Sequence, residues 1–369
     1  MTRKLSYDLL AFAAFMLVIF LVVPTVYDYD GFELNTFARY LSLAIVALAL
    51  SLSWGSAGLL NLGQAATFGI GSYAMAMHLK LRASDGLPDF MAWNNVETLP
   101  WIWVPFHSLG FTILAGLLVP AAVGGIIATF MFRARIAGVF VAVITLAFLV
   151  AFQLLVIDQQ GMTGGQNGLT GLAQLNLFGW EVDTYSTAFY YLVAGCLMIA
   201  LAVGLYVSHS KFGLILRAIR EDAERTRFFG YNVASFETMI FCISAALAGW
   251  AGMLYVLVLE FASPTYMSVS FSLAIVIWVA VGGRESVIAA AIGAILVNAL
   301  EGRLSDVFVE GWNLMLGVTF VLVVIFMPRG LFGLVTSMIK MATERVRIRS
   351  HRPHAIKPIK ANSQSEGRR

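Results

Sequence analysis

Apolar segments separated by short polar stretches follow one another along most of this chain. A hydrocarbon core about 30 Å thick is crossed by roughly 20 mostly apolar helical residues, so each segment is a candidate membrane span. The third, eighth and ninth segments are short, and we expect them to be broken or tilted elements packed away from lipid. The pattern predicts ten spans: Leu9–Tyr27, Phe37–Trp54, Gln64–Leu79, Leu109–Phe132, Gly138–Ile157, Ala188–Ser208, Phe236–Leu259, Ser270–Gly282, Ser286–Leu300 and Trp312–Met327.

One apolar stretch, WGSAGLLNLGQAATFGIGSYAMAM (54–77), is interrupted by five glycines and by the amides Asn61 and Gln64. It is too apolar for an exposed loop and too irregular for an ordinary membrane helix. Glycine permits a change of backbone direction and a close approach of helices, so we expect a break near Gly63. A second glycine-interrupted segment, Val279–Ala294, is a candidate pseudo-symmetric counterpart, as in transporters built from broken helices.

The composition agrees with this pattern. Of the 369 residues, 59% are hydrophobic and 12% are charged, and the mean hydropathy is +0.82. Such a chain is not a water-soluble domain, so we predict an all-α integral membrane protein, a polytopic bundle of about ten helices. We expect a transmembrane domain over residues 1–340 and a basic, disordered cytoplasmic tail over residues 341–369.

The distribution of basic residues predicts the orientation, because Lys and Arg in short loops are retained in the cytoplasm during insertion. With ten spans, most basic residues fall on one side, which we assign to the cytoplasm together with both termini. These are Arg3, Lys4, Arg133, Arg135, the segment 211–227, Arg284 and the tail. The exceptions on the opposite side are Arg39, Lys80, Arg82 and Arg303.

Motifs for enzymatic chemistry are absent from the sequence. It contains no G-x-x-x-x-G-K-[ST] phosphate loop, no H-E-x-x-H and no Cys/His cluster, so we predict no nucleotide, cofactor or metal on this chain. A serine protease centred on Ser56 would need a base at the same depth, usually a histidine, and none is present. We therefore predict that the chain is not an enzyme.

The segment 209–235, HSKFGLILRAIREDAERTRFFGYNVAS, is the most informative hydrophilic stretch. We predict a short amphipathic helix, and Gly230 is placed to end it in a left-handed cap. A solvated surface helix and a helix that docks on a separate motor protein are both compatible with this pattern. The predicted apolar face has Leu214, Ile215, Ala218, Ile219, Asp222 and Ala223, and the charged face has Arg217, Arg220, Glu221, Glu224 and Arg227.

The same segment resembles the coupling helix of ABC importer permeases, whose core pattern is E-A-A-x-x-x-G. Here the pattern is ERTRFFG, from Glu224 to Gly230, so glutamate and glycine match while Arg225 and Thr226 replace the two alanines. Other stretches occur in an order that resembles the second permease subunit of the branched-chain amino acid ABC transporter family: NLGQAATFGIGSYAMA, GMTGGQNGLTG, SAALAGWAGMLY, VAVGGRESVIAAAIGA and LGVTFVLVVIFMPRGLFGL.

Within this family, four further stretches resemble the permease of the urea transporter: GLPDFMAWNNVETLPWIWVPF, RFFGYN, VIWVAVGGR and VNALEGRLSDVFVEGW. The resemblance implies a bacterial inner-membrane importer with a second, different permease, two cytoplasmic ATPase subunits that bind ATP and Mg²⁺, and a periplasmic solute-binding protein. Nucleic acid has no role in it. Residues that match the coupling position are Arg217, Arg220, Glu221, Glu224 and Gly230.

Polar side chains at bilayer depth are costly unless they face the interior of the bundle, so they are candidates for the translocation path. Urea is small and neutral, and amide and hydroxyl groups could replace its water partners without a charge. For any single residue, an interhelical hydrogen bond is the alternative role. The candidates are Asn61, Gln64, Thr67, Tyr73, Thr145, Gln153, Trp278 and Asn298.

The glycine-rich GMTGGQNG segment lacks the lysine of a phosphate loop and lies on the predicted outer side. We predict that Thr163, Gly164, Gly165 and Asn167 face the binding protein. The predicted function is therefore urea import as an ABC permease subunit. Branched-chain amino acids or short-chain amides are alternative solutes, and a secondary transporter or channel is the alternative of another class.

Overall fold

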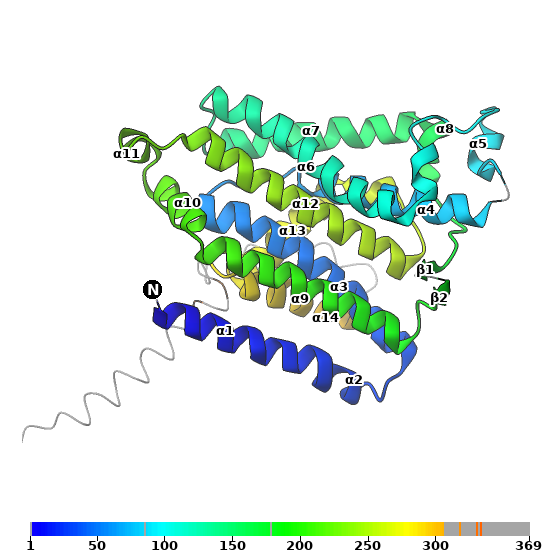
Figure 1. Ribbon diagram of the computed structural model, residues 1–369, viewed down its shortest axis with the longest axis horizontal. Coiled ribbons are helices and arrows are strands. Elements are labelled where there is room, and N and C mark those ends of the chain that lie inside the picture. Colours follow the sequence, from blue (N-terminus) through cyan, green and yellow to red (C-terminus); the bar gives the residue numbers. More distant parts are fainter. Residues whose placement is uncertain are drawn as a thin grey trace, which may run out of the picture.

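The computed structural model describes residues 2–305 except 85 and 178, together with residues 317, 318, 330 and 333. Its long helices run side by side in roughly one direction across Figure 1, with α1 at one edge and α7 at the other. The long elements are α1 (Thr2–Leu17), continued by η1 (Val18–Val22) and α2 (Val23–Val26); α3 (Gly31–Ser51), continued by η2 (Leu52–Ser56); α4 (Gln64–Ala83); α6 (Leu109–Arg133); α7 (Val139–Asp158); α9 (Thr187–His209); α12 (Val233–Leu259); α13 (Val269–Gly282) and α14 (Val287–Ser305).

Short elements lie at the two ends of the bundle. One end carries α10 (Lys211–Glu221) and α11 (Ala223–Phe228), and we call it the α10 end (Figure 1). At the opposite end, β1 (Leu175–Leu177) and β2 (Trp180–Val182) form an antiparallel hairpin, so we call it the hairpin end. The remaining short elements are α5 (Asp89–Trp93), η3 (Val104–His107), α8 (Gln160–Thr163), η4 (Gly165–Asn167) and η5 (Pro264–Met267).

The predicted all-α membrane fold is confirmed, but the predicted count of ten spans is not. Within the described residues, six helices are long and apolar enough to cross a membrane, or up to seven if the pair α13 and α14 counts as one. That pair is bent by 117° at its break, as expected for the short eighth and ninth segments. The third segment forms α4, which has 20 residues. The tenth predicted span and the tail lie almost entirely outside the described residues.

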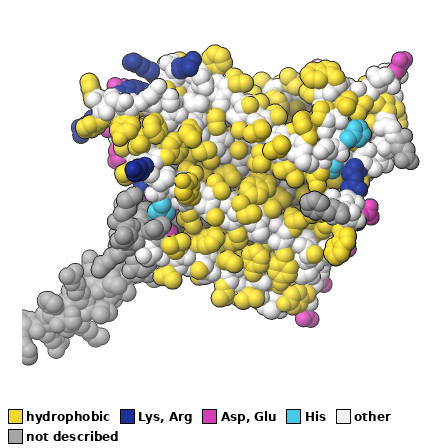
Figure 2. Space-filling model, viewed as in Figure 1, with side chains coloured by type: hydrophobic (Ala, Val, Ile, Leu, Met, Phe, Trp, Pro, Cys, Tyr) yellow, Lys and Arg dark blue, Asp and Glu magenta, His cyan; other side chains and the backbone are white. Residues whose placement is uncertain are grey.

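Helices α3, α4 and α12 form the interior of the bundle. The membrane-length window of α3 is 83% buried inside the protein, against 22% for the first helix and 28% for α7. Helix α12 packs against α3, α4 and α6. The outer helices α1 and α7 therefore present most of their apolar side chains to the surroundings. In the view of Figure 2, hydrophobic side chains cover the middle of the molecule, between its two ends.

Several basic loops that the sequence predicts on one side lie together at the α10 end. The α6–α7 turn with Arg133 and Arg135 lies there, as does the start of α1 (Figure 1). The α13–α14 turn is at the same end, because the carboxylate of Glu285 in this turn lies 3.7 Å from Nη1 of Arg220 in α10. Which side of the membrane this end faces stays a prediction.

Close helix approach in the interior depends on glycine. A Cβ atom built on Gly71 of α4 would lie 2.0 Å from the carbonyl oxygen of Gly249 in α12. A Cβ atom on Gly249 would in turn lie 2.3 Å from the carbonyl oxygen of Gly116 in α6. Helices α4, α12 and α6 thus pack backbone against backbone, as small residues allow in membrane proteins.

We predict that Gly71→Ala destabilises the folded protein by about 1–3 kcal/mol or more, because the new methyl group overlaps a backbone carbonyl that cannot move freely. The measurement is thermal unfolding of the purified protein in detergent. Gly195→Ala in α9 is the matched control, since a Cβ atom there meets nothing within 4 Å. Equal melting temperatures for the two variants would contradict the role assigned to Gly71.

Candidate translocation and coupling site

The expected break in the 54–77 stretch is present. Helix α3 continues as the π-helical turn η2 to Ser56, and residues 57–63 then run without regular helix until α4 begins at Gln64. We call residues 57–63 the strap. Gly58 in the strap has φ of +76°, a left-handed conformation that favours glycine. The strap therefore carries backbone polar groups that no regular helix can satisfy.

The amides of Gly58 and Leu59 donate to the carbonyl oxygens of Trp54 and Ser53 in η2, and side chains supply partners at the far end of the strap. The amide of Leu62 donates to Oγ1 of Thr145 in α7 at 3.1 Å, and its carbonyl accepts from Oγ of Ser272 in α13. The amide of Gly63 donates to Oδ1 of Asn61 at 2.8 Å. The strap is thus fastened to α7 and α13, two elements that are distant in the sequence.

The two amides that interrupt the stretch bond to each other. Nδ2 of Asn61 donates to Oε1 of Gln64 at 2.7 Å. Nε2 of Gln64 donates to the carbonyl oxygen and to Oγ of Ser244 in α12, both at 3.1 Å. Oγ of Ser244 donates to the carbonyl oxygen of Ala49 in α3 at 2.6 Å. This chain of hydrogen bonds links the strap and α4 to α12 and α3.

We call Asn61, Gln64, Thr145, Ser244 and Ser272 the polar node. All five are buried, with at most 2% of each residue exposed. Ser244 lies near the middle of α12, so the node lies well inside the bundle. Every side chain of the node is uncharged. Each makes at least one hydrogen bond to another element or to the strap, so the interhelical role that the sequence left open has direct geometric support.

The other predicted path residues are more scattered. Thr67 is buried and donates to the carbonyl oxygen of Gln64 in its own helix, and Asn298 does the same to Ala294 in α14. Gln153 of α7 donates to the carbonyl oxygen of Pro264 at 3.2 Å. The hydroxyl of Tyr73 and Nε1 of Trp278 are buried without a partner in the described part of the chain. That these residues line the translocation path stays a prediction.

Sequence reasoning missed Ser244 and Ser272. Serines in membrane helices commonly bond to their own helix, so an isolated serine in an apolar run gives no signal. Only the fold shows that these two hydroxyls reach the strap and Gln64.

The predicted amphipathic helix of segment 209–235 is two helices. Asp222 separates α10 from α11 with an extended backbone, at φ −158° and ψ 100°, and its carboxylate accepts from the amide of Arg225 at the start of α11. Gly230 has φ of +87°, as a left-handed cap requires. The break arises because Asp222 caps a new helix instead of continuing the old one.

The predicted faces of α10 were wrong in part, although Ile219 is buried and Glu221 is exposed as predicted. Gly213, Leu216 and Ile219 are buried, whereas Leu214 and Ala218, assigned to the apolar face, are exposed. Arg217 and Arg220, assigned to the charged face, are only partly exposed and bind inward. The helix is rotated relative to the prediction because the arginine stems pack against the bundle and their guanidinium groups reach backbone carbonyls.

The inward contacts of the two arginines differ. Nη1 of Arg217 donates to the carbonyl oxygen of Ser208 in α9 at 2.9 Å. Nη1 of Arg220 donates to the carbonyl oxygen of Gly55 in η2 at 2.6 Å. The side chains of Glu221 and Glu224 are 76% and 70% exposed, so these two predicted coupling residues are available on the surface.

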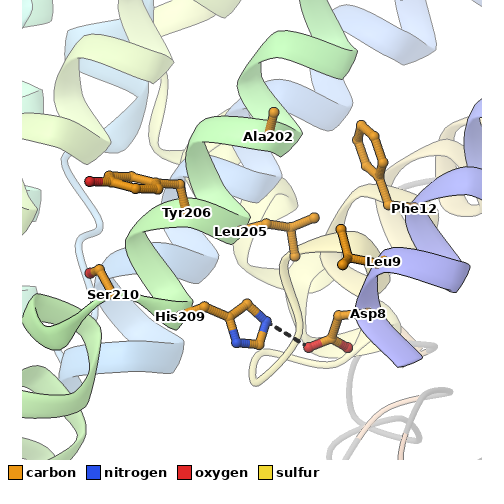
Figure 3. Close-up of a pocket in the computed structure, with 8 residues that line it drawn as sticks. All are labelled: Asp8, Leu9, Phe12, Ala202, Leu205, Tyr206, His209 and Ser210. Atoms are coloured by element: carbon orange, nitrogen blue, oxygen red, sulfur yellow. Dashed lines mark hydrogen bonds and ion pairs between the residues drawn. The ribbon is translucent and has the colours of Figure 1, made fainter. Parts of the chain in front are cut away.

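Helix α1 is tied to the start of α10. Figure 3 shows Asp8 of α1 facing His209 of α9, and their Oδ2 and Nε2 atoms are 2.9 Å apart. The next residue, Ser210, caps α10 by accepting from the amide of Gly213. Beside this pair, α1 and α9 enclose an apolar groove of about 390 Å³, lined among others by Leu9, Phe12 and Tyr206.

At the hairpin end, the predicted binding-protein loop packs over the end of α4. Thr163 donates to the carbonyl oxygen of Val156 at 2.6 Å, and Gly164 and Gly165 have positive φ angles. Asn167 and Gly164 line a pocket of about 70 Å³ together with Lys80. Lys80, one of the basic residues predicted on the side opposite to most others, thus packs against this loop.

Lys80 is a buried cation with two partners. Its Nζ lies 2.7 Å from Oδ1 of Asp89 and donates to the carbonyl oxygen of Thr170 at 2.8 Å. The hydrogen bond from Lys80 holds the pKa of the Asp89 carboxyl below its usual range, although burial acts in the opposite direction. This pair fastens α5 and the loop after α8 to α4.

Comparison with known proteins gives a consistent result. A family model described as "Branched-chain amino acid transport system / permease component" matches residues 33–324. The high-affinity branched-chain amino acid transport system permease proteins LivM of Salmonella typhimurium and Escherichia coli are each 31% identical over 322 residues, covering 80% of this chain and 69% of theirs. BraD of Pseudomonas aeruginosa is 24% identical over 329 residues, covering 84% of this chain and 98% of its own. No solved structure gives a significant match.

We predict that the Lys80–Asp89 pair keeps the backbone amides of α5 protected from hydrogen exchange down to acidic pH. Because the pKa of Asp89 is lowered in the folded state, its contribution is complete above about pH 4, the ordinary value for aspartate, and is lost as pH falls through the lower folded value. The measurement is the hydrogen-exchange protection factor of the amides in 89–93. Asp89→Asn should lose this protection at every pH, whereas Glu97→Gln, an exposed acid in the same loop, should keep it. Unchanged protection in Asp89→Asn would contradict this role.

Proposed function

The chain belongs to the family of branched-chain amino acid transport permeases, and from this premise we propose that it forms the translocation path of an ATP-driven importer together with a second, different permease. Two cytoplasmic ATPase subunits would bind ATP and Mg²⁺, and a periplasmic binding protein would deliver the solute. The chain itself is a multi-pass membrane protein and a transport subunit, as are the permease proteins it resembles, not an enzyme. We further propose that both termini are cytoplasmic.

The observation that carries this proposal is the surface of α10 and α11. These helices lie at the end of the bundle and expose Glu221, Glu224 and an aromatic pair, Phe228 and Phe229, which are 89% and 82% exposed. Exposed aromatic side chains beside charged ones are typical of a protein interface. A channel or secondary transporter would have no use for such a docking surface, so the importer is the better explanation.

We propose that the polar node and its neighbours form one wall of the path. The node is buried and uncharged, and among the described residues its amides have only each other and Ser244 as side-chain partners. Two further candidates, Tyr73 and Trp278, hold buried polar hydrogens without partners in the described chain. A small polar solute could bond to such groups as the helices separate. Thr67, Gln153 and Asn298 complete the set.

The solute has two candidates. The relatives are named for branched-chain amino acid transport, which supports leucine-like solutes. The neutral amides and hydroxyls of the node, together with the sequence stretches similar to urea permeases, support urea, which carries no charge to be paired. We propose a small neutral solute, with urea tested first and leucine as its competitor. We also propose that the loop of Thr163, Gly164, Gly165 and Asn167 faces the binding protein.

We predict that cells with this chain deleted lose uptake of labelled urea and recover it when the chain is restored. The measurement is initial uptake of labelled urea and labelled leucine in the same strains. Loss of leucine uptake alone would assign branched-chain amino acids and overturn urea. Copurification with an ATPase, measured in parallel, separates the importer from a channel or secondary transporter.

We predict that Asn61→Ala and Gln64→Ala lower uptake about tenfold, because each removes an amide from the path, while association with the ATPase is retained. Ser72→Ala is the matched control. It removes a buried hydroxyl that links α4 to the carbonyl oxygen of Gly252 in α12 at 3.2 Å but lies outside the proposed path, so it should lower thermal stability by a similar amount and uptake much less. Uptake losses that simply follow the stability losses in all three variants would leave only the interhelical role.

A further inference from the structure

We propose that Arg220 is the positioning residue through which movement of the coupling segment reaches the strap and the polar node. This inference rests on the proposed function, since it requires an ATPase that moves α10 and α11. From the sequence, Arg220 was expected to act at the coupling position that faces the ATPase, and the structure gives it a different role. The side chain is 26% exposed and binds the bundle, instead of reaching outward to a partner.

The contacts of Arg220 lie on both sides of the start of the strap. Its Nη1 donates to the carbonyl oxygen of Gly55, one residue before η2 ends, at 2.6 Å. Its Cγ lies 3.0 Å from the position of a Cβ atom on Gly58, so the aliphatic stem packs directly on the strap. One side chain of α10 therefore holds both the end of η2 and the strap.

The hydrogen bond has a physical reason. Carbonyl groups in the last turn of a helix lack partners within that helix, and the negative end of the helix dipole attracts cations. The guanidinium of Arg220 supplies a charged donor to Gly55 at this position, and charge-assisted hydrogen bonds are stronger than neutral ones. This strong hydrogen bond should therefore persist when α10 moves, so that η2 moves with it.

The same arginine also reaches the second broken element. Its Nη1 lies 3.7 Å from Oε1 of Glu285 in the α13–α14 turn. This turn is packed on η2 without spare space, because a Cβ atom on Gly55 would lie 1.8 Å from the carbonyl oxygen of Arg284. The guanidinium of Arg284 lies over the ring of Trp54, 5.5 Å from its centroid. Arg220 therefore contacts the point where both breaks of the fold meet.

From this point the strap leads to the node over a few residues. Its far end is tightly packed, since a Cβ atom on Gly63 would lie 2.8 Å from the carbonyl oxygen of Thr145. The strap is fastened there to α7 and α13 through Leu62. Because packed elements shift between discrete arrangements, a displacement of Gly55 and Gly58 has a short and continuous route to the node.

The test uses the complete transporter, with both permeases, the ATPases and the binding protein, reconstituted in liposomes. The measured quantity is solute imported per ATP hydrolysed, with labelled urea or leucine, whichever the wild-type protein imports. Arg220→Met keeps the stem that packs on Gly58 and removes the charged hydrogen bond. We expect ATP hydrolysis to persist and import per ATP to fall about tenfold or more, the effect of losing a hydrogen bond to a charged group. Arg220→Lys should restore part of the ratio.

Arg133→Ala is the control, because it removes an exposed basic side chain at the same end of the bundle and should leave the ratio unchanged. A wild-type ratio in Arg220→Met would overturn the proposal. Should that variant fail to assemble, hydrogen exchange of the wild-type complex decides. Between the ATP-bound and nucleotide-free states, we expect the hydrogen-exchange rates of the amides in 55–63 and in 211–228 to change together. A change confined to the amides of 211–228 would overturn the proposal. If wild-type complexes show no ATP-driven import, the proposed function fails instead.

Discussion

The structure depends on one constraint, that a backbone interrupted inside a membrane must find partners for its polar groups within the protein. The strap, residues 57–63, is such an interruption, and Ala57, Leu59, Asn61 and Gly63 within it are buried. The amides of Gly58 and Leu59 bond to carbonyl oxygens of η2. The polar groups of Leu62 and the amide of Gly63 are satisfied by Thr145, Ser272 and Asn61, and the same set of contacts continues through Gln64 to Ser244. The arrangement of α3, α4, α7, α12 and α13 around the strap follows from this need.

Glycine and polar side chains act together in this arrangement. The backbone contacts of Gly71 with Gly249 bring α4 close enough to α12 for Gln64 to reach Ser244. Bulkier residues at the glycines would increase that separation and leave buried amides without partners, which costs more than the hydrogen bonds themselves are worth. The hydrogen bonds of the polar node therefore require the close packing of α4 on α12, and these bonds in turn help to hold the two helices together.

The sequence predicts the features that depend on local pattern. The long apolar helices, the break near Gly63 and the positive φ angle of Gly230 all follow from composition and glycine placement. Features that depend on distant partners were not predictable. Gln64 and Ser244 are 180 residues apart, and nothing local to Ser244 indicates that its hydroxyl serves another helix. The orientation of α10 was predicted wrongly because a helical wheel places arginine outside, whereas Arg220 finds a carbonyl acceptor inside.

The chemistry of the polar node has a consequence for the energetics of the membrane. Hydrogen bonds run in one direction from the amide of Gly63 through Asn61, Gln64 and Ser244 to Ala49, and no group in this series gains or loses a proton near neutral pH. A row of carboxylates or histidines at the same depth could pass protons across the bilayer. Amides and hydroxyls fixed in this way give polarity without a titrating site. Helices can thus rearrange around the node without opening a route by which protons cross the membrane.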